Sequence, residues 1–131
     1  MRGLFQLTGA SRRNAAVDQW LDRCEGELGS IARHWVERLR ACGPDVEDVM
    51  HDGCPTACVQ GAAFAYVGLF SGHVTVGFYH GAALPDAAKL LQGTGKYMRH
   101  VKLRPGSGVD APLAALLDAA YADIRLRLRN A

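Results

Sequence analysis

The stretch from Leu91 to Arg104 holds the residues whose types and spacing are best suited to binding chemistry. Its turn, Gly93-Thr94-Gly95, leads straight into a strand-like segment with five basic side chains: Lys96, Arg99, His100, Lys102 and Arg104. Glycines accept positive φ and can present backbone N–H groups, so a turn of this kind followed by cations is able to hold an anion. A purely structural turn followed by a solvated strand would give the same pattern, and the residues leave both readings open.

Known nucleotide loops do not fit this stretch. A phosphate-binding P-loop needs a glycine five residues before Gly95 and a hydroxyl after the lysine, but Leu90 and Tyr97 stand there. A dinucleotide fingerprint also fails, because a strand and not a helix follows the glycines. Alternation along the strand puts His100, Lys102 and Arg104 on one face and Arg99 on the other, beside Val101 and Leu103. We therefore expect Arg99 to be either a buried structural ion pair or the head of a ligand pocket.

A second group of residues suggests metal chemistry. His51, Cys54 and Cys58 lie close in sequence, but the paired spacing of a zinc site is absent. Clustered oxygen ligands suit a hard cation such as iron. The candidate ligands for a weak iron site are Asp45, Glu47, Asp48, His51 and Asp52. The alternative is an ordinary solvated acidic face.

Composition limits the classes of function. At 131 residues the chain is expected to form one domain, with 49% apolar residues, 21% charged residues and a net charge of +2. That charge is too small to indicate nucleic acid or an anionic membrane as a partner. No apolar run reaches membrane-spanning length, and no secretory signal precedes the four cysteines. We expect a cytoplasmic protein with reduced thiols and no catalytic signature, which favours binding over catalysis.

The hydrophobic pattern predicts an α+β domain. We expect a loose segment at 1–11, then a single domain over 12–131 with two helices within 12–42, the second capped by Ser30. Short strands are expected between 46 and 60, a hairpin over 63–80 around Ser71-Gly72, helical turns at 86–91, a strand at 98–104 and a helix capped by Asp110. The elements form two layers, an antiparallel sheet of about 4–6 strands packed against N-terminal and C-terminal helices.

The hairpin register divides its side chains between two faces. Leu69 with Val74, Val67 with Val76 and Ala65 with Phe78 form an apolar face that should be core. The opposite face carries Phe64, Tyr66, Phe70 and Tyr79. This aromatic face is either a stacking platform or groove, with Tyr66 and Tyr79 as ligand-binding residues, or a surface covered by a helix or by a second copy of the chain.

Several segments together resemble the YdhG-like family of small bacterial domains, over about residues 35–128. The resemblance rests on Gly43-Pro44-Asp45-Val46, Pro55, the run from Val74 to Ala82, Leu84-Pro85-Asp86 and, most specifically, the run from Leu91 to Lys102. The resemblance implies a compact α+β domain of largely unknown function and brings no catalytic residues. Because the family includes a frataxin-like iron chaperone, it also implies iron binding at acidic surface residues as one possible role.

The leading hypothesis is a non-enzymatic binding protein for a small anionic ligand or an acidic partner. Its binding residues would be Gly93, Gly95, Lys96, Arg99, His100 and Lys102, with Tyr66 and Tyr79. Two alternatives stay open: an iron-binding chaperone that uses the acidic residues, and a homodimeric scaffold that uses the aromatic face.

Overall fold

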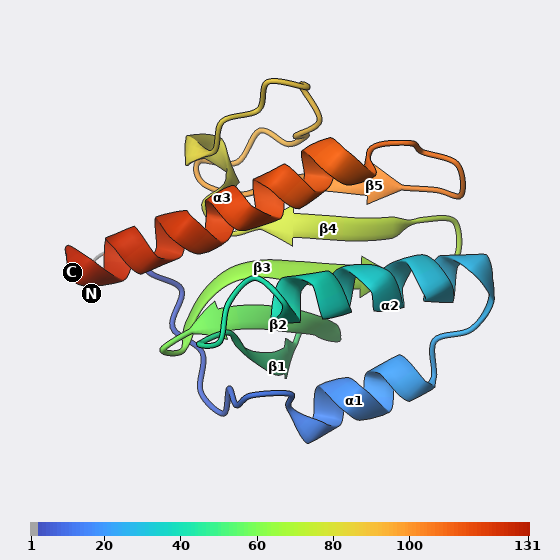
Figure 1. Ribbon diagram of the computed structural model, residues 1–131, viewed down its shortest axis with the longest axis horizontal. Helices are drawn as coiled ribbons and strands as arrows, with labels where there is room; N and C mark the ends of the chain where they lie inside the picture. Colours follow the sequence, from blue (N-terminus) through green and yellow to red (C-terminus); the bar gives the residue numbers. More distant parts are fainter. Residues whose placement is uncertain (1–2) are drawn as a thin grey trace.

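The computed structural model describes residues 3–131, and Figure 1 shows an α+β fold in which the helices cover one face of a sheet. All neighbouring strands are antiparallel, in the order β1-β2-β3-β4-β5. The predicted two-layer class and strand number are thus confirmed. In chain order the elements are α1 (Ala15–Asp22), α2 (Gly26–Arg40), β1 (Glu47–His51), β2 (Cys54–Val59), β3 (Ala62–Leu69), β4 (Val74–Phe78), the 3-10 turn η1 (Gly81–Ala83), β5 (Arg99–Leu103) and α3 (Asp110–Arg129).

The two N-terminal helices form as separate elements, as the sequence predicts. The side chain of Asn14 accepts a hydrogen bond from the backbone N–H of Ala16 and caps α1. Gly26 begins α2 with φ +70°, so the second helix starts about a turn before Ser30, and the prediction of Ser30 as its N-cap was wrong. Asp110 likewise lies inside the first turn of α3, where Val109 and not Asp110 occupies the cap position.

The β3–β4 hairpin has the register that the sequence predicts, with Leu69 opposite Val74, Val67 opposite Val76 and Ala65 opposite Phe78. One residue of the predicted aromatic face is displaced. The β2–β3 register shifts between Ala57 and Cys58, and the resulting bulge turns Phe64 toward the helices, where it joins the main core. The aromatic face therefore lacks Phe64, because a bulge interrupts the two-residue alternation.

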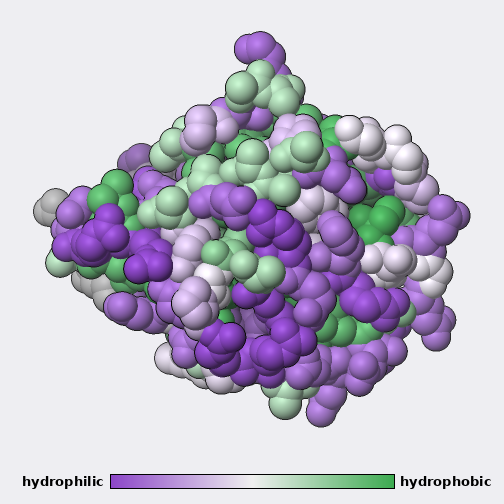
Figure 2. Space-filling model, in the orientation of Figure 1, coloured by the Kyte–Doolittle hydropathy of each residue, from purple (hydrophilic) through white to green (hydrophobic). Residues whose placement is uncertain are grey.

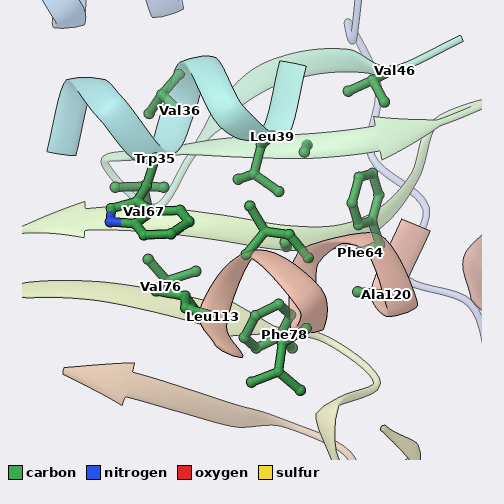
Figure 3. Packing of buried hydrophobic residues seen from close by; sticks show 14 of the residues in the cluster. Trp35, Val36, Leu39, Val46, Phe64, Val67, Val76, Phe78, Leu113 and Ala120 are labelled. Carbon is green, nitrogen blue, oxygen red and sulfur yellow. The ribbon is translucent and has the colours of Figure 1, made fainter. Parts of the chain in front are cut away.

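The core lies between the sheet and the helices. Figure 3 shows Trp35 and Leu39 of α2 and Leu113 of α3 packed over Val67 and Val76. These side chains are almost completely removed from water. Burying each large apolar side chain contributes on the order of 1.5–3 kcal/mol, which makes this layer the main source of stability.

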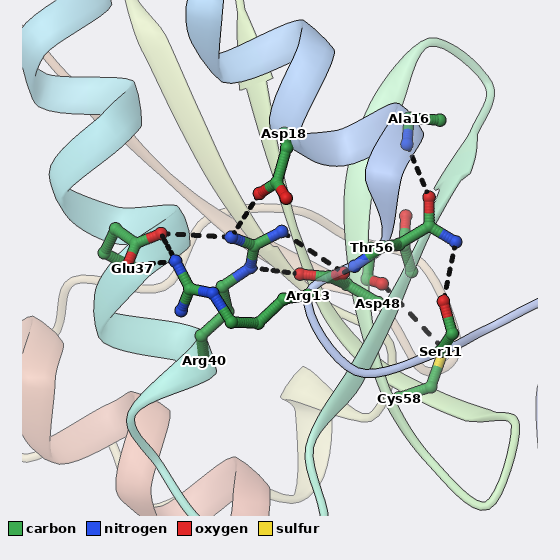
Figure 4. A network of polar contacts seen from close by, with 10 residues as sticks. Ser11, Arg13, Ala16, Asp18, Glu37, Arg40, Asp48, Thr56 and Cys58 are labelled. Carbon is green, nitrogen blue, oxygen red and sulfur yellow. Dashed lines mark hydrogen bonds and ion pairs between the residues drawn. The ribbon is translucent and has the colours of Figure 1, made fainter.

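A buried polar network joins α1, α2 and β1 at one side of this core (Figure 4). Arg40 on α2 donates from Nε to Asp48 Oδ2 at 2.6 Å and from Nη1 to Asp18 Oδ1 at 2.7 Å and Glu37 Oε1 at 3.1 Å. The other oxygen of Asp48 accepts the backbone N–H of Asn14 at 2.8 Å. Asp18 lies on α1 and Asp48 on β1, so their bonds to Arg40 of α2 fix the relative positions of these three elements.

The N-terminal segment is bonded to the sheet, in contrast to the loose start expected for residues 1–11. Ala63 donates to the carbonyl of Phe5 and Leu7 donates to Gly61, both at 2.9 Å. Ser11 pairs with Asp48 of β1 through two backbone hydrogen bonds. These bonds satisfy backbone groups of the sheet, which sequence periodicity does not reveal. The first two residues of that prediction, 1–2, lie outside the described part of the chain.

The segment before β5 is irregular, although helical turns were predicted at 86–91. The carboxylate of Asp86 accepts the backbone N–H groups of Leu90 at 2.8 Å and Leu91 at 2.9 Å, and Lys89 has φ +56°. A side chain that takes these N–H groups competes with helical hydrogen bonds, and this is the physical reason that the prediction failed.

Figure 2 views the side of the molecule covered by the helices, whose outer surface is largely hydrophilic. Within residues 3–131, every helix is too short or too polar to cross a membrane.

Candidate functional site

The sheet has a second face, turned away from the helices, which we call the open face. On β4 and β5 the helix side takes Val74, Val76, Phe78, Val101 and Leu103, which belong to the main core. Alternation then assigns the intervening residues to the open face. They are His73, Thr75, Gly77 and Tyr79 at β4, His100, Lys102 and Arg104 at β5, and Tyr66, Gly68 and Phe70 at β3.

One end of the open face is covered. Phe5, Leu7 and Ala10 pack there against a small second cluster of Cys58, Ala63 and Tyr79. The other end, around Phe70 and Lys102, remains accessible, because both residues are exposed. The N-terminal segment, and not a helix, thus supplies the partial cover.

Four basic residues meet at the accessible end, and we call them the basic cluster: His73, His100, Lys102 and Arg104. Thr75 pairs with Lys102 and Gly77 with His100, so the cluster spans two hydrogen-bonded strands. Desolvation, followed by the charges of Lys102, Arg104 and His100, lowers the pKa of His73. Among the ion pairs between residues 3 and 131, none includes a member of the cluster. The cluster is therefore a local positive field on a chain of small net charge.

Two aromatic rings lie beside the basic cluster, each against a glycine. A Cβ atom at Gly77 would be 2.0 Å from Cε1 of Tyr66, so the ring occupies the space that any other residue would fill. A Cβ at Gly68 would be 2.8 Å from Cε2 of Phe70. Phe70 also stacks on His73 with ring centroids 4.9 Å apart, yet it stays 50% exposed. Because glycine has no Cβ atom, the aromatic rings can pack directly against the sheet next to the cations.

Tyr79 does not belong to the accessible surface, although the sequence suggested it as a ligand-binding residue. It is buried below Phe5, with ring centroids 5.1 Å apart, and its ring meets Tyr66 edge-on at 6.0 Å. Burial raises the pKa of Tyr79 to about 12. Its role is to pack the N-terminal segment onto the sheet, which the hairpin register could not show.

The turn before β5 has a different construction from the expected anion nest. Nη1 of Arg99 donates to the carbonyl oxygens of Gly95 at 2.5 Å and Met98 at 2.7 Å. The turn therefore directs carbonyl groups at its own arginine. Of its two glycines only Gly93 has a positive φ, at +117°. The buried ion pair expected as one alternative for Arg99 is not formed, because no ion pair of the described residues includes it. Its guanidinium instead closes the turn.

The remaining residues predicted from this stretch divide between two places. Lys96 lies over the ring of Tyr97, 5.3 Å from its centroid, in the loop. His100 is at the open face, where its backbone forms two hydrogen bonds with Gln92. Gly93 lies beneath it, since a Cβ there would be 3.6 Å from Nδ1 of His100. Only His100 and Lys102 of the predicted basic set thus join the candidate site, with Tyr66.

The five residues predicted to bind iron do not converge. Asp48 is buried against Arg40, whereas Asp45 accepts a hydrogen bond from Tyr121 and pairs with Arg125 at 3.6 Å. His51 and Asp52 contact each other at 3.4 Å in the β1–β2 turn, and alternation places Glu47 on the open face of β1. Across residues 3–131, no group of three or more histidines, cysteines and carboxylates is arranged to hold a metal ion. Asp48 and Asp45 instead join separate parts of the fold.

A pocket of about 620 Å³ lies between α2, the β5–α3 loop and the start of α3. Trp35, Ile31 and Leu103 form its apolar wall, and His34 and Asp110 contribute polar groups. Arg104 belongs to the basic cluster and also lines this pocket, so the two features adjoin. The pocket mixes one carboxylate with basic groups, whereas the basic cluster has a single sign of charge.

The four cysteines are free thiols, and none is prepared for nucleophilic chemistry. Burial raises the pKa of Cys58 to about 12 and that of Cys42 to about 11, with smaller increases at Cys24 and Cys54. The reactive form of cysteine is the thiolate, which a raised pKa disfavours.

Sequence reasoning missed His73 as a member of the site. It placed Arg104 in the basic stretch and Phe70 on the aromatic face, but named neither among the ligand-binding residues. The missing signal was the pairing of β4 with β5, which brings His73 and Arg104 to neighbouring ends of adjacent strands. Comparisons with protein-family models, with curated proteins and with solved structures found no match to this chain. The resemblance to the YdhG-like family therefore stays a prediction.

Proposed function

We propose that this chain is a non-enzymatic binding protein that holds an anionic ligand or an acidic partner on the open face. The observation that carries the proposal is the basic cluster. Lys102 and Arg104 with two histidines occupy adjacent strands and have no carboxylate partner in the ion pairs of the described chain. Several cations elsewhere are paired with carboxylates, as Arg38 is with Asp118 at 2.8 Å.

The position of the cluster supports binding. Thr75 and Gly77 pair with Lys102 and His100, so the cluster lies beside small residues of β4 and beside the ring of Tyr66 that covers Gly77. Like charges held together repel one another, and an anion placed among them relieves that repulsion. Lys102 supplies a mobile point charge and Arg104 a planar fork that fits a phosphate or carboxylate.

The test is thermal unfolding in the presence of inorganic phosphate, tripolyphosphate and small dicarboxylates, with sodium chloride at matched ionic strength. A ligand at 100 times its dissociation constant stabilises the folded state by about 2.7 kcal/mol, which shifts the midpoint by several degrees. We expect this shift in the wild type and its loss in the double variant Lys102→Ala/Arg104→Ala.

Arg99→Ala is the same-strand control, because its guanidinium donates to the carbonyl oxygens of Gly95 and Met98 in the turn. It should keep the ligand-induced shift even if its own midpoint falls. Loss of the shift in Arg99→Ala, with retention in the double variant, would overturn the proposed site.

A further inference from the structure

The open face combines the basic cluster with aromatic rings that lie on glycines, and simple anion binding does not account for the rings. The side chain of Phe70 is half-exposed, and its ring packs against Gly68 of the sheet. Exposed phenylalanine is costly in water, so its placement beside cations points to a ligand with both an anionic and a planar part.

The rings and cations are arranged in two rows. Tyr66 lies on β3 and Phe70 directly follows that strand, so their Cα atoms are roughly 13 Å apart, while the ring of Phe70 turns back onto Gly68. His100, Lys102 and Arg104 recur at every second residue of β5, or roughly every 6.6 Å. The β3 and β5 backbones are roughly 10 Å apart with β4 between them, and both rings reach toward β4, that of Tyr66 onto Gly77 and that of Phe70 onto His73. A ligand that fits both rows must repeat its anionic group and its planar group along one direction.

We infer that the open face binds single-stranded nucleic acid, with bases stacked on Phe70 and Tyr66 and phosphates held by Lys102 and Arg104. This inference rests on the proposed function and names its ligand. A single strand presents bases that are free to stack, whereas a duplex keeps its bases inside. An acidic peptide would satisfy the cations but would leave the flat aromatic rings without a partner.

The small net charge of the chain does not contradict this inference. The net charge of +2 is the sum over all residues of the chain and does not describe the charge of one surface. Acidic residues are concentrated elsewhere, with Asp18, Glu37 and Asp48 around Arg40 in the network of Figure 4. The electrostatic contribution to binding depends on the cations that contact phosphates and not on the total.

The experiment measures fluorescence anisotropy of a labelled oligothymidylate about 12 nucleotides long, a length within the usual site sizes for single strands. An abasic strand of equal length carries the same phosphates without bases, and a duplex of equal length hides its bases. We expect the oligothymidylate to bind at least about fivefold more tightly than the abasic strand, since stacking contributes roughly 1–3 kcal/mol per base.

Two variants test the contributions of the aromatic rings and of the cations to binding separately. Phe70→Ala should weaken binding of the oligothymidylate about fivefold or more and leave binding of the abasic strand unchanged. Tyr97→Ala is its matched control, because Tyr97 is exposed to a similar extent, at 47%, but its ring contacts Phe5 and Lys96 instead of His73. Lys102→Ala/Arg104→Ala should weaken both strands and reduce the slope of log affinity against log salt by roughly 1.4, or 0.7 for each phosphate contact.

The outcomes separate this inference from the proposed function. Equal affinity for the abasic and normal strands, or preference for the duplex, would overturn the inference. If the double variant still lost tripolyphosphate binding, the anion site itself would stand and an acidic partner would replace nucleic acid as its occupant. Absence of binding to every strand and to tripolyphosphate would overturn both. Self-association of the wild type that Phe70→Ala abolishes, without strand binding, would assign the face to a second copy of the chain.

Discussion

Arg40 and Asp48 form an ion pair inside the protein, with Nε and Oδ2 2.6 Å apart and side chains only 6% and 4% exposed. Burial alone would lower the pKa of Arg40, but hydrogen bonds to Asp48 and Asp18 raise it overall, so the guanidinium stays charged. The pair connects α2 to the edge strand β1, and Asp18 extends the connection to α1. This network assigns Asp48 to the fold rather than to metal binding.

Arg40→Ala is therefore expected to destabilise the protein strongly. Removing one partner leaves the buried carboxylate of Asp48 without compensation, which typically costs about 3–5 kcal/mol. Urea unfolding followed by circular dichroism measures the change. Arg38→Ala is the control, since its pair with Asp118 is more exposed and should cost about 1 kcal/mol or less. Equal effects of the two substitutions would show that burial does not determine the strength of the Arg40 pair.

The sequence predicted those parts of the fold that depend on periodicity. The hairpin register followed from the alternation of apolar residues around Ser71-Gly72, and the helix stripes followed from their spacing. The bulge that moves Phe64 could not be predicted in this way, because an extra residue in a strand leaves no mark in composition.

The candidate site was only partly predictable for a related reason. Alternation placed His100 and Lys102 on one face correctly. The position of that face next to Phe70 and His73 depends on long-range pairing of β4 with β5. Arg99 and Tyr79 were assigned to the site because their residue types suit binding. In the structure, Arg99 donates to carbonyl oxygens of its own turn, and Phe5 of the N-terminal segment covers Tyr79.

Gly77→Ala tests whether Tyr66 lies on the sheet as the structure shows. The new Cβ would be 2.0 Å from Cε1 of the ring, so the ring must move or the strand must shift. Overpacking of this kind costs roughly 1–3 kcal/mol. In a Tyr66→Ala background the same substitution should cost much less, because the ring is gone.

A double-mutant cycle with urea unfolding measures this coupling between Gly77 and Tyr66. Gly72→Ala is a suitable control glycine, since a Cβ there would meet no atom within 4 Å. An unchanged cost of Gly77→Ala in the Tyr66→Ala background would mean that the two residues are not in contact.

His80 is expected to make stability depend on pH. It is buried, its Nε2 has no hydrogen-bond partner among the described residues, and it lies near Phe5, Asp123 and Arg127. Desolvation and then the charge of Arg127 lower its pKa from 6.5, with Asp123 acting in the opposite direction. The unfolded state therefore binds the proton more readily, and stability should fall as pH decreases through about 6.5.

Urea unfolding from pH 7.5 to 5.5, compared between the wild type and His80→Asn, isolates this contribution because asparagine does not titrate in that range. As the pH decreases, the free energy of unfolding should fall more for the wild type than for His80→Asn. His51→Asn, which removes a half-exposed histidine from the β1–β2 turn, is the control substitution. A difference that is constant over the range would assign the pH dependence to other groups.

His73 gives the binding site its own pH dependence. Desolvation and the charges of Lys102, Arg104 and His100 lower its pKa in the free protein. A bound anion would oppose those charges and raise the pKa, so binding takes up a proton near pH 6.5. By linkage, affinity for tripolyphosphate should increase as pH decreases through that range.

Titration calorimetry in buffers of different ionisation enthalpy measures the proton uptake directly, and His73→Asn should reduce it while Lys102 and Arg104 still bind the anion. Uptake that is the same in His73→Asn would place the titrating group elsewhere and remove His73 from the site.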